Sequence, residues 1–361
     1  MRQHYSNNDI EAFLSLVHLG INHAAYPLSQ NYNWPVIQTL ALKHGLDAVV
    51  LDGVEKLPES KRPPKELVLQ WIGEVLQNFE QRYNLYCKAI AEMAEFYNTH
   101  HYRMMILKGY ACSLDWPKPN HRPCGDIDIW LFGQQKYADI LLHESKSIKV
   151  DGSHHHHTVF YWNEFMVENH YDFLNVHHHK SNRALEAILK DLGKDDSHYV
   201  QLNGEWVYLP SQKLHALFLL RHMMSNFAST GMLLRQLLDW AFFVEKHGKE
   251  LDWEWLLRIL EMYGMMPLFQ LFNAICVEDL GFSPEIFPTV QYDLFIKERV
   301  LNEIISPEFN EIEKGGIVSR ALFKYRRWKA NKWKHELCFN DSIWSAFWSG
   351  VKSHIMKPSS I

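Results

Sequence analysis

Two aspartates that stand one residue apart could do chemistry together. Asp126 and Asp128 lie in the segment 125–131, where apolar Ile127, Ile129 and Leu131 alternate with them. This alternation predicts a strand with one apolar face toward a core and both carboxylates on the other face. Two like charges on one face repel each other, and a cation between them relieves that repulsion. The pair therefore predicts a divalent-metal site.

Two further features could complete such a site. A predicted strand at 103–108 ends at Lys108-Gly109, and a short helix is expected to open at Tyr110, which together suit a phosphate group. Glu168, on a later predicted strand, supplies a third carboxylate. Mg²⁺ or Mn²⁺ bound by a few carboxylates and by phosphate oxygens fits this set, so we predict a nucleoside triphosphate as substrate. Two such ions about 3.5–4 Å apart could hold the attacking and leaving oxygens of an in-line displacement.

Helical segments surround the strands that must position these residues. From Pro64 to about Thr99, apolar side chains recur at steps of three and four residues, which is typical of a helix. Short β-rich runs follow, with one helical stretch between them, and the helical period returns at Ser211. We therefore predict an α+β fold. A small mixed-sheet domain at 100–210 would lie between helical parts at 1–99 and 211–361.

The bulk composition excludes several classes of protein. The chain has 361 residues, 47% of them hydrophobic, and a formal net charge of -5, so its overall field does not indicate nucleic acid as a partner. Five cysteines match neither a disulfide framework nor a zinc signature. No signal peptide and no apolar stretch of about 18 residues is evident, so we expect a soluble cytoplasmic protein.

These motifs resemble the uncharacterised nucleotidyltransferase family of the polymerase-β-like superfamily, which is common in bacterial polysaccharide loci. That family typically shows a Leu-Lys-Gly turn, an Arg-x-x-Gly-Asp-x-Asp strand, a Glu-x-His strand and a later helix with a Leu-Arg…Asp pattern. The matching residues are Lys108 with Gly109, Arg122 with Gly125, Asp126 and Asp128, Glu168 with His170, and Arg235 with Asp239. Tyr110 stands where the wider superfamily usually has glycine or serine.

The resemblance implies a small nucleotidyltransferase domain and a metal-dependent reaction. A nucleoside monophosphate would pass from a triphosphate to an acceptor hydroxyl, with release of pyrophosphate. Asp126, Asp128 and Glu168 would be the catalytic, metal-binding residues. The nucleotide-binding residues would be Lys108, Gly109, Tyr110, Arg122 and Gly125. The residues on the acceptor side or behind the metal ligands would be His170, Arg235 and Asp239.

Other interpretations of the same residues stay open. Asp126-x-Asp128 also fits the metal motif of nucleotide-sugar glycosyltransferases, but those enzymes place a nucleotide-binding sheet before it, and here about 100 helical residues precede it. The chain could also be a catalytically silent nucleotide- or sugar-binding partner in polysaccharide assembly, although all three acids are present. Arg235 and Asp239 could form a plain ion pair one helical turn apart, and Arg122 could simply pair with a neighbouring acid.

Two histidine clusters and a basic segment also invite a functional interpretation. The clusters His154–His157 and His177–His179 lack the spacing of a zinc site, so we expect strand-edge and loop histidines. Segment 320–334 is basic and aromatic and could contact an anionic membrane surface or nucleic acid, or be a solvated helix that packs its aromatics inward. Because the rest of the chain is acidic, we favour a small-molecule or carbohydrate acceptor over RNA.

Overall fold

The computed structural model describes residues 5–22, 31–154, 156–176, 179–288, 291–309, 316–340 and 342. The chain forms two compact units. The helical unit comprises Met1–Asn78, Leu220–Lys249 and Trp253–Phe339, and the sheet unit comprises Phe79–Leu219, Glu250–Asp252 and Asn340–Ile361. Each unit is considered by itself.

A six-stranded mixed sheet forms the centre of the sheet unit. Its strands are β1 (Met105–Ile106), β2 (Ile127–Trp130), β3 (His157–Trp162), β4 (Phe165–His170), β5 (Tyr199–Leu202) and β6 (Glu205–Tyr208). The strand order is β3-β4-β2-β1-β6-β5. The pairs β2–β4 and β1–β6 are parallel, and the other neighbours are antiparallel. This mixed sheet with flanking helices confirms the predicted α+β fold.

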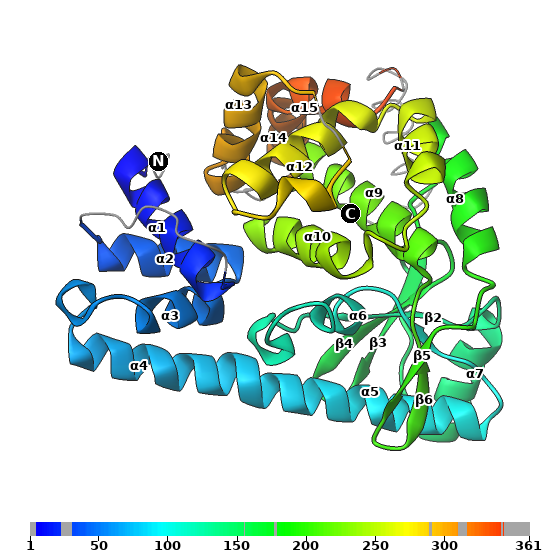
Figure 1. The fold of residues 1–361 in the computed structure, drawn as a ribbon. Coiled ribbons are helices and arrows are strands. Elements are labelled where there is room, and N and C mark those ends of the chain that lie inside the picture. The colour runs from blue at the N-terminus through cyan, green and yellow to red at the C-terminus, as the bar shows by residue number, and fades with distance from the viewer. Residues whose placement is uncertain are drawn as a thin grey trace. The chain divides into compact units, whose positions relative to one another are not determined.

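Helices cover the sheet in its own unit. They are α5 (Arg82–Thr99), α6 (Tyr110–Ser113), α7 (Gln135–Lys146), α8 (Lys180–Leu192) and the first part of α9 (Gln212–Ala228). Helix α5 packs against β5 and β6 (Figure 1). It also contributes Tyr86, Ile90 and Tyr97 to a buried core that contains Ile127 and Ile129 of β2. The apolar period predicted up to Thr99 is thus used to bury one face of a helix.

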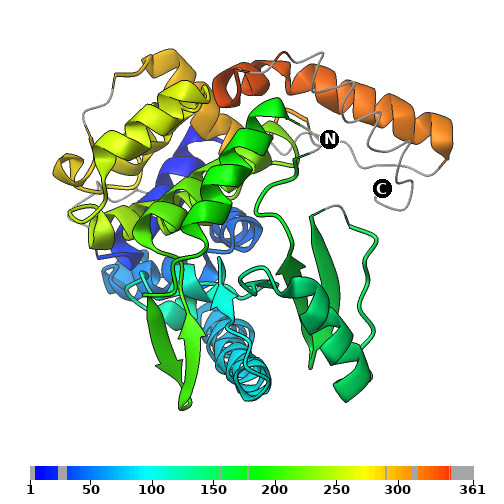
Figure 2. The same cartoon turned by 90° about the vertical axis from the view of Figure 1, so that its right-hand side faces the viewer.

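Helix α7 fixes the outer pair of strands. It lies beside β3 and β4 (Figure 2). Its Asp139 accepts hydrogen bonds from Asn169 of β4 at 2.8 Å, from Thr158 of β3 at 2.9 Å and from Tyr171 at 2.7 Å. Asn169 is fully buried, and its neighbours in sequence therefore point to the other face of the sheet.

The described part of the helical unit consists mainly of α-helices. They are α1 (Asn7–Gly20), α2 (Trp34–His44), α3 (Asp47–Glu55), α4 (Lys65–Val75), α10 (Leu234–His247), α11 (Trp253–Met262), α12 (Met266–Glu278), α13 (Leu294–Ile305), α14 (Ile317–Ala330) and α15 (Lys332–Cys338). A π-helical segment, Leu76–Gln81, lies between α4 and α5. Helix α2 has Pro35 in its first turn and left-handed Gly45 after its last residue, two residues that suit the start and the end of a helix.

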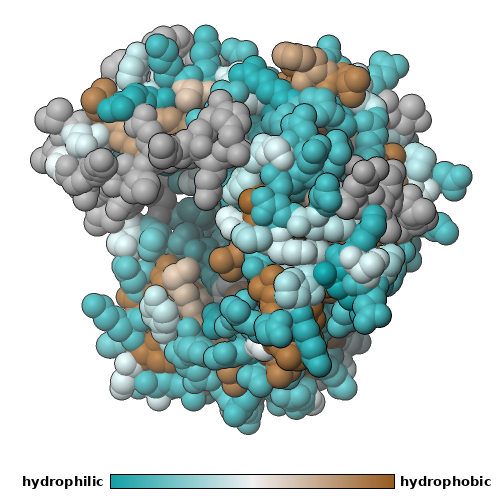
Figure 3. Space-filling model, turned by 90° about the vertical axis from the view of Figure 1, so that its left-hand side faces the viewer, coloured by the Kyte–Doolittle hydropathy of each residue, from teal (hydrophilic) through white to brown (hydrophobic). Residues whose placement is uncertain are grey.

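Figure 3 shows the hydropathy of the residues on one face of the molecule. On the face in Figure 3, hydrophobic residues lie as separate patches among hydrophilic ones. Within the described residues, none of the helices has the length and apolar character needed to cross a bilayer.

Candidate active site

The register of two parallel strands brings the predicted acids together. In the pairing of β2 with β4, Asp128 lies opposite Glu168, and Ile127 lies opposite Val167. Ile127 and Val167 are fully buried in the core, so Asp128 and Glu168 share the opposite face of the sheet. Asp126 directly precedes β2 and, by the same alternation, belongs to the face of Asp128.

Strand β3 adds histidines that the sequence interpretation missed. Its antiparallel pairing with β4 places His157 opposite His170, and the Nε2 of His157 lies 3.7 Å from a carboxylate oxygen of Glu168. The ring of His156 is 5.9 Å from the ring of His170. The sequence could have predicted this placement of His157. A two-residue turn after Trp162 fixes the register of the hairpin and sets position 157 opposite position 170.

The turn before the aspartates depends on a glycine. Gly109 has a φ of +43°, and a Cβ at this position would lie 2.3 Å from the Tyr86 hydroxyl oxygen. That hydroxyl donates a 2.9 Å hydrogen bond to the backbone oxygen of Asp126. The missing side chain therefore lets α5 hold the start of β2 against the turn. Helix α6 begins at Tyr110, as predicted, and Tyr110 is buried.

Asp128 is the most tightly compensated acid of the site. Its Oδ1 atom lies 2.8 Å from the Lys108 ammonium and 2.9 Å from His170 Nε2. Burial alone would raise the pKa of Asp128, but the Lys108 charge and the His170 hydrogen bond hold it well below its usual range. Burial alone would lower the pKa of His170, but its hydrogen bonds to Asp128 and Glu168 raise this pKa to about 9. The positive charge that the sequence predicts beside the aspartates is thus supplied in part by Lys108 and His170.

The remaining acids and imidazoles have different environments. Burial and the neighbouring Asp128 charge raise the pKa of Asp126. The pKa of Glu168 is lowered, because a hydrogen bond from His170 outweighs the effect of burial. Burial lowers the pKa of His157 to about 4. The site therefore holds Asp128 and Glu168 ionised at neutral pH, beside a neutral His157.

The donor set fits a divalent metal ion. One ligand atom each from Asp128, Glu168 and His170 can be chosen so that all three lie within 4.8 Å of one another. Two carboxylates and an imidazole suit a borderline divalent cation. Asp126, which was predicted as a metal ligand with Asp128 and Glu168, is not part of this close group.

The other residues predicted for the site do not belong to the close group of Asp128, Glu168 and His170. Arg122 is buried and donates to the Pro123 backbone oxygen at 3.3 Å. A Cβ at Gly125 would meet no atom within 4 Å. Arg235 and Asp239 lie one turn apart on α10, which belongs to the helical unit. Their roles, like those of the whole predicted set, stay predictions.

The histidine clusters and the basic segment are only partly described. His155, His177 and His178 lie outside the described residues, whereas the His154 ring stacks on His157 at 4.7 Å. Segment 320–334 forms α14 and the start of α15. Its Lys334 is buried and pairs with Glu303 at 2.5 Å. At least one positive charge of this segment therefore serves internal packing.

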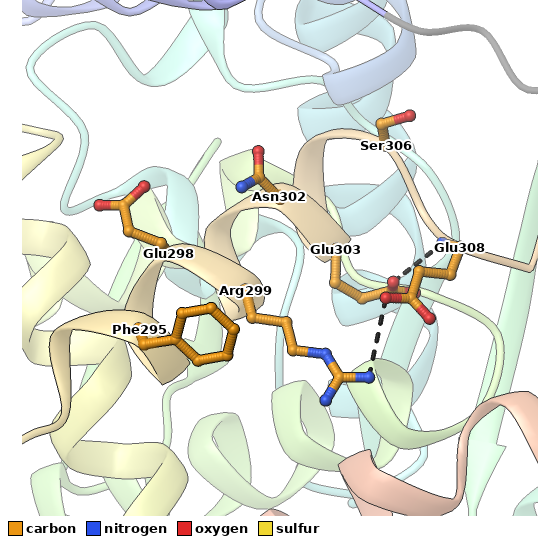
Figure 4. A pocket seen from close by; sticks show the side chains of 7 residues that line it. All are labelled: Phe295, Glu298, Arg299, Asn302, Glu303, Ser306 and Glu308. Atoms are coloured by element: carbon orange, nitrogen blue, oxygen red, sulfur yellow. Dashed lines mark hydrogen bonds and ion pairs between the residues drawn. The ribbon is translucent and has the colours of Figure 1, made fainter.

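A pocket of about 350 Å³ lies in the helical unit rather than beside the acids. Its lining residues, drawn in Figure 4, are Phe295, Glu298, Arg299, Asn302, Glu303, Ser306 and Glu308. Arg299 pairs with Glu308 at 3.7 Å, and the Glu308 backbone N–H donates to Glu303 at 2.8 Å. None of the predicted site residues lines this pocket.

Comparisons with known proteins give one family and one structural likeness. A family model described as "Uncharacterised nucleotidyltransferase" matches residues 30–281. A crystal structure of an antigenic nucleotidyltransferase-like protein from Paracoccidioides brasiliensis is similar over 44% of this chain and 75% of that chain, at 15% identity and a TM-score of 0.32. No curated protein matches the sequence.

Proposed function

Because the chain belongs to the uncharacterised nucleotidyltransferase family, we propose that it transfers a nucleoside monophosphate from a nucleoside triphosphate to an acceptor hydroxyl. The observation that carries this proposal is the register of β2 and β4, which sets Asp128 beside Glu168, together with the Lys108 ammonium 2.8 Å from Asp128. Negative side chains next to a cation at a turn with little side-chain bulk suit a metal-bound triphosphate.

In the proposed reaction the acceptor oxygen attacks the α-phosphorus of the triphosphate. A new P–O bond forms, the bond to the bridging oxygen breaks, and pyrophosphate leaves. Glu168 is ionised and can take the proton of the attacking hydroxyl. Lys108 and the open backbone at Gly109 would bind phosphate oxygens, with Tyr110, Arg122 and Gly125 as further nucleotide-side residues. A bound Mg²⁺ or Mn²⁺ would supply charge stabilisation of the transferring group.

We further propose a small-molecule or carbohydrate acceptor, in polysaccharide biosynthesis, rather than RNA. RNA affinity depends on phosphate contacts by exposed cations, and the chain has a net charge of -5. The strongest basic segment uses Lys334 in a buried pair with Glu303. Retention of RNA at low salt that is lost at moderate salt and in a variant with Arg326, Arg327 and Lys329 changed to Ser would overturn this preference.

The activity is tested first by binding and then by turnover. Thermal unfolding is followed with each of the four nucleoside triphosphates, with and without Mg²⁺ or Mn²⁺. An active site should be stabilised by nucleotide and metal together more than by either alone. For a catalytically silent binding partner, the stabilisation by nucleotide should be the same with and without the metal ion. Stabilisation by nucleotide that does not depend on the metal would therefore count against catalysis.

Turnover is then measured as pyrophosphate release from the responding triphosphate, with candidate sugars and sugar phosphates as acceptors. Asp128→Asn is the inactive control. Glu303→Gln, which lies in the helical unit, serves as the control for a general change in folding.

A further inference from the structure

His170 contacts both carboxylates of the candidate metal site. Its Nε2 atom lies 2.9 Å from Asp128 Oδ1 and 3.5 Å from Glu168 Oε2. The side chain is almost fully buried, on the strand that carries Glu168. His157, on the neighbouring strand, contacts Glu168 at 3.7 Å through its own Nε2. The two imidazoles thus approach the same acid, but His170 also reaches Asp128.

The second nitrogen of His170 has the environment of a metal-ligating histidine. Its Nδ1 lies 3.2 Å from the backbone oxygen of Asp172, which accepts its hydrogen. A ligating histidine usually donates its other ring N–H to a carbonyl or carboxylate in this way, which orients the ring and aims the ligating nitrogen at the metal. For His157 Nδ1, by contrast, the described residues provide no hydrogen-bond partner.

The spacing of the ligand atoms suits a common ion. Two ligands at right angles around an octahedral ion with bonds of about 2.1 Å lie about 3.0 Å apart. The 2.9 Å hydrogen bond between His170 Nε2 and Asp128 Oδ1 has nearly this length, so an ion can replace the proton between the two atoms with little movement. The 3.5 Å from His170 Nε2 to Glu168 Oε2 requires a small side-chain adjustment.

We propose that His170 becomes a direct ligand of the divalent ion, together with Asp128 and Glu168, when the ion displaces the Nε2 proton that Asp128 accepts, and that its nitrogen makes the site prefer Mn²⁺ to Mg²⁺. Mg²⁺ favours an all-oxygen shell and gives up water reluctantly, whereas imidazole binds ions later in the first transition row more strongly. This inference rests on the proposed function, in that the two acids must bind a metal ion at all.

The test is pulsed electron paramagnetic resonance of Mn²⁺ added alone to the whole protein. Electron spin echo envelope modulation detects nitrogen nuclei directly bound to the ion. Wild-type protein should show ¹⁴N modulation, and protein with ¹⁵N-labelled histidine should show the ¹⁵N pattern instead. His170→Asn should lose the modulation, whereas the matched control His157→Asn should keep it.

Metal competition gives the second readout. The ratio of the Mg²⁺ to the Mn²⁺ dissociation constant should fall about tenfold in His170→Asn and stay unchanged in His157→Asn. If wild-type protein binds Mn²⁺ without nitrogen modulation, His170 is not a ligand and the inference fails alone. If wild-type protein binds neither ion, with or without nucleotide, the proposed function fails too. The labelled wild-type sample shows whether a histidine binds the ion at all, and modulation retained in His157→Asn excludes the neighbouring imidazole even where His170→Asn does not fold.

Discussion

Two buried lysine–carboxylate pairs, one in each unit, look alike and have different surroundings. Lys108 lies 2.8 Å from Asp128 in the sheet unit, and Lys334 lies 2.5 Å from Glu303 in the helical unit. Asp128, Lys334 and Glu303 are each at most 3% exposed, and Lys108 is 15% exposed. The other oxygen of Glu303 accepts a backbone N–H from Glu308. Lys334, one local hydrogen bond and the nearby charge of Lys43 together compensate Glu303 in this second pair.

The pair in the sheet unit has additional charge around it. Asp126 and Glu168 add two carboxylates near Lys108. Burial alone would lower the pKa of Lys108, but the charges of Asp128, Asp126 and Glu168 raise it. His170 contributes a further hydrogen bond to Asp128.

Like charges gathered in a buried place are costly. Lys297 of the helical unit also has several carboxylates around it, but Glu278 and Glu298 are 38% and 51% exposed, so solvent screens their charges. The difference suggests that a balanced pair serves stability and an unbalanced one serves a ligand.

The largest expected effect comes from removing the acid at the centre of the unbalanced group. Asp128→Asn should lower pyrophosphate release about 10³-fold, because metal-assisted charge stabilisation supplies several kcal/mol to the transition state. It should also lower the melting temperature, because Lys108 loses its closest counterion.

Asp126→Asn is the matched comparison for Asp128→Asn. It should also lose activity, yet leave stability equal or slightly higher, since the pKa of Asp126 is raised by burial and by its neighbour. Equal changes in melting temperature for the two variants would show that Lys108 does not stabilise Asp128 more than Asp126.

Breaking the balanced pair should affect stability alone. Glu303→Gln leaves Lys334 buried without its ion-pair partner and should cost about 3–5 kcal/mol of unfolding free energy. Denaturant unfolding measures the loss, and turnover per folded molecule should stay at the wild-type value. The double variant Glu303→Gln/Lys334→Met should recover most of the stability. A fall in turnover below the unfolding transition would link this pair to the reaction.

The sequence predicted that Asp126 and Asp128 share one face of a strand because that pattern is local. Strict alternation at Asp126 and Asp128 sets the face of a strand, and the helical period up to Thr99 sets a buried helix face. Partners from distant segments were not predictable in the same way. The contact of Lys108 with Asp128 depends on the order and register of β1 and β2, which one sequence does not specify, whereas the place of His157 follows from a local hairpin.

The same reasoning explains one expectation that the structure changes. Two aspartates on one face predicted mutual repulsion relieved by a bound cation. The repulsion is evident in the raised pKa of Asp126, but Asp128 is already compensated by Lys108 and by His170. A count of charges along the chain cannot assign a compensating lysine to one of two neighbouring acids.

A more moderate effect should separate the two roles within the unbalanced group. Glu168→Gln keeps the shape of the side chain and loses its charge, so it should lower the turnover number about 10²-fold, as expected for a lost proton acceptor. The Michaelis constant for the triphosphate should change little, because the proposed role of Glu168 is on the acceptor side. Steady-state kinetics with varied triphosphate give both values. A large rise in the Michaelis constant with normal turnover at saturation would assign Glu168 to nucleotide binding instead.

The smallest effect concerns an acid of the helical unit in a third kind of environment. Asp47 opens α3, and its Oδ2 is buried without a hydrogen-bond partner among the described residues. Burial raises its pKa to about 6. The folded state therefore binds more protons than the unfolded state between the unfolded and folded pKa values. The contribution of Asp47 to stability is present below the unfolded pKa and is lost as pH rises through about 6.

Asp47→Asn should remove this dependence on pH, because the amide carries no charge at any pH. Its melting temperature should equal that of wild type near pH 4 and exceed it by about 1–2 °C near pH 7.5, a small value because the side chain is only partly buried and solvent screens its charge. Glu11→Gln, on the exposed side of α1, is the control and should shift neither value. If the melting temperatures of Asp47→Asn and wild type differ by the same amount at both pH values, the buried charge of Asp47 does not oppose folding. An uncompensated acid in the sheet unit would then be no evidence of a functional site either.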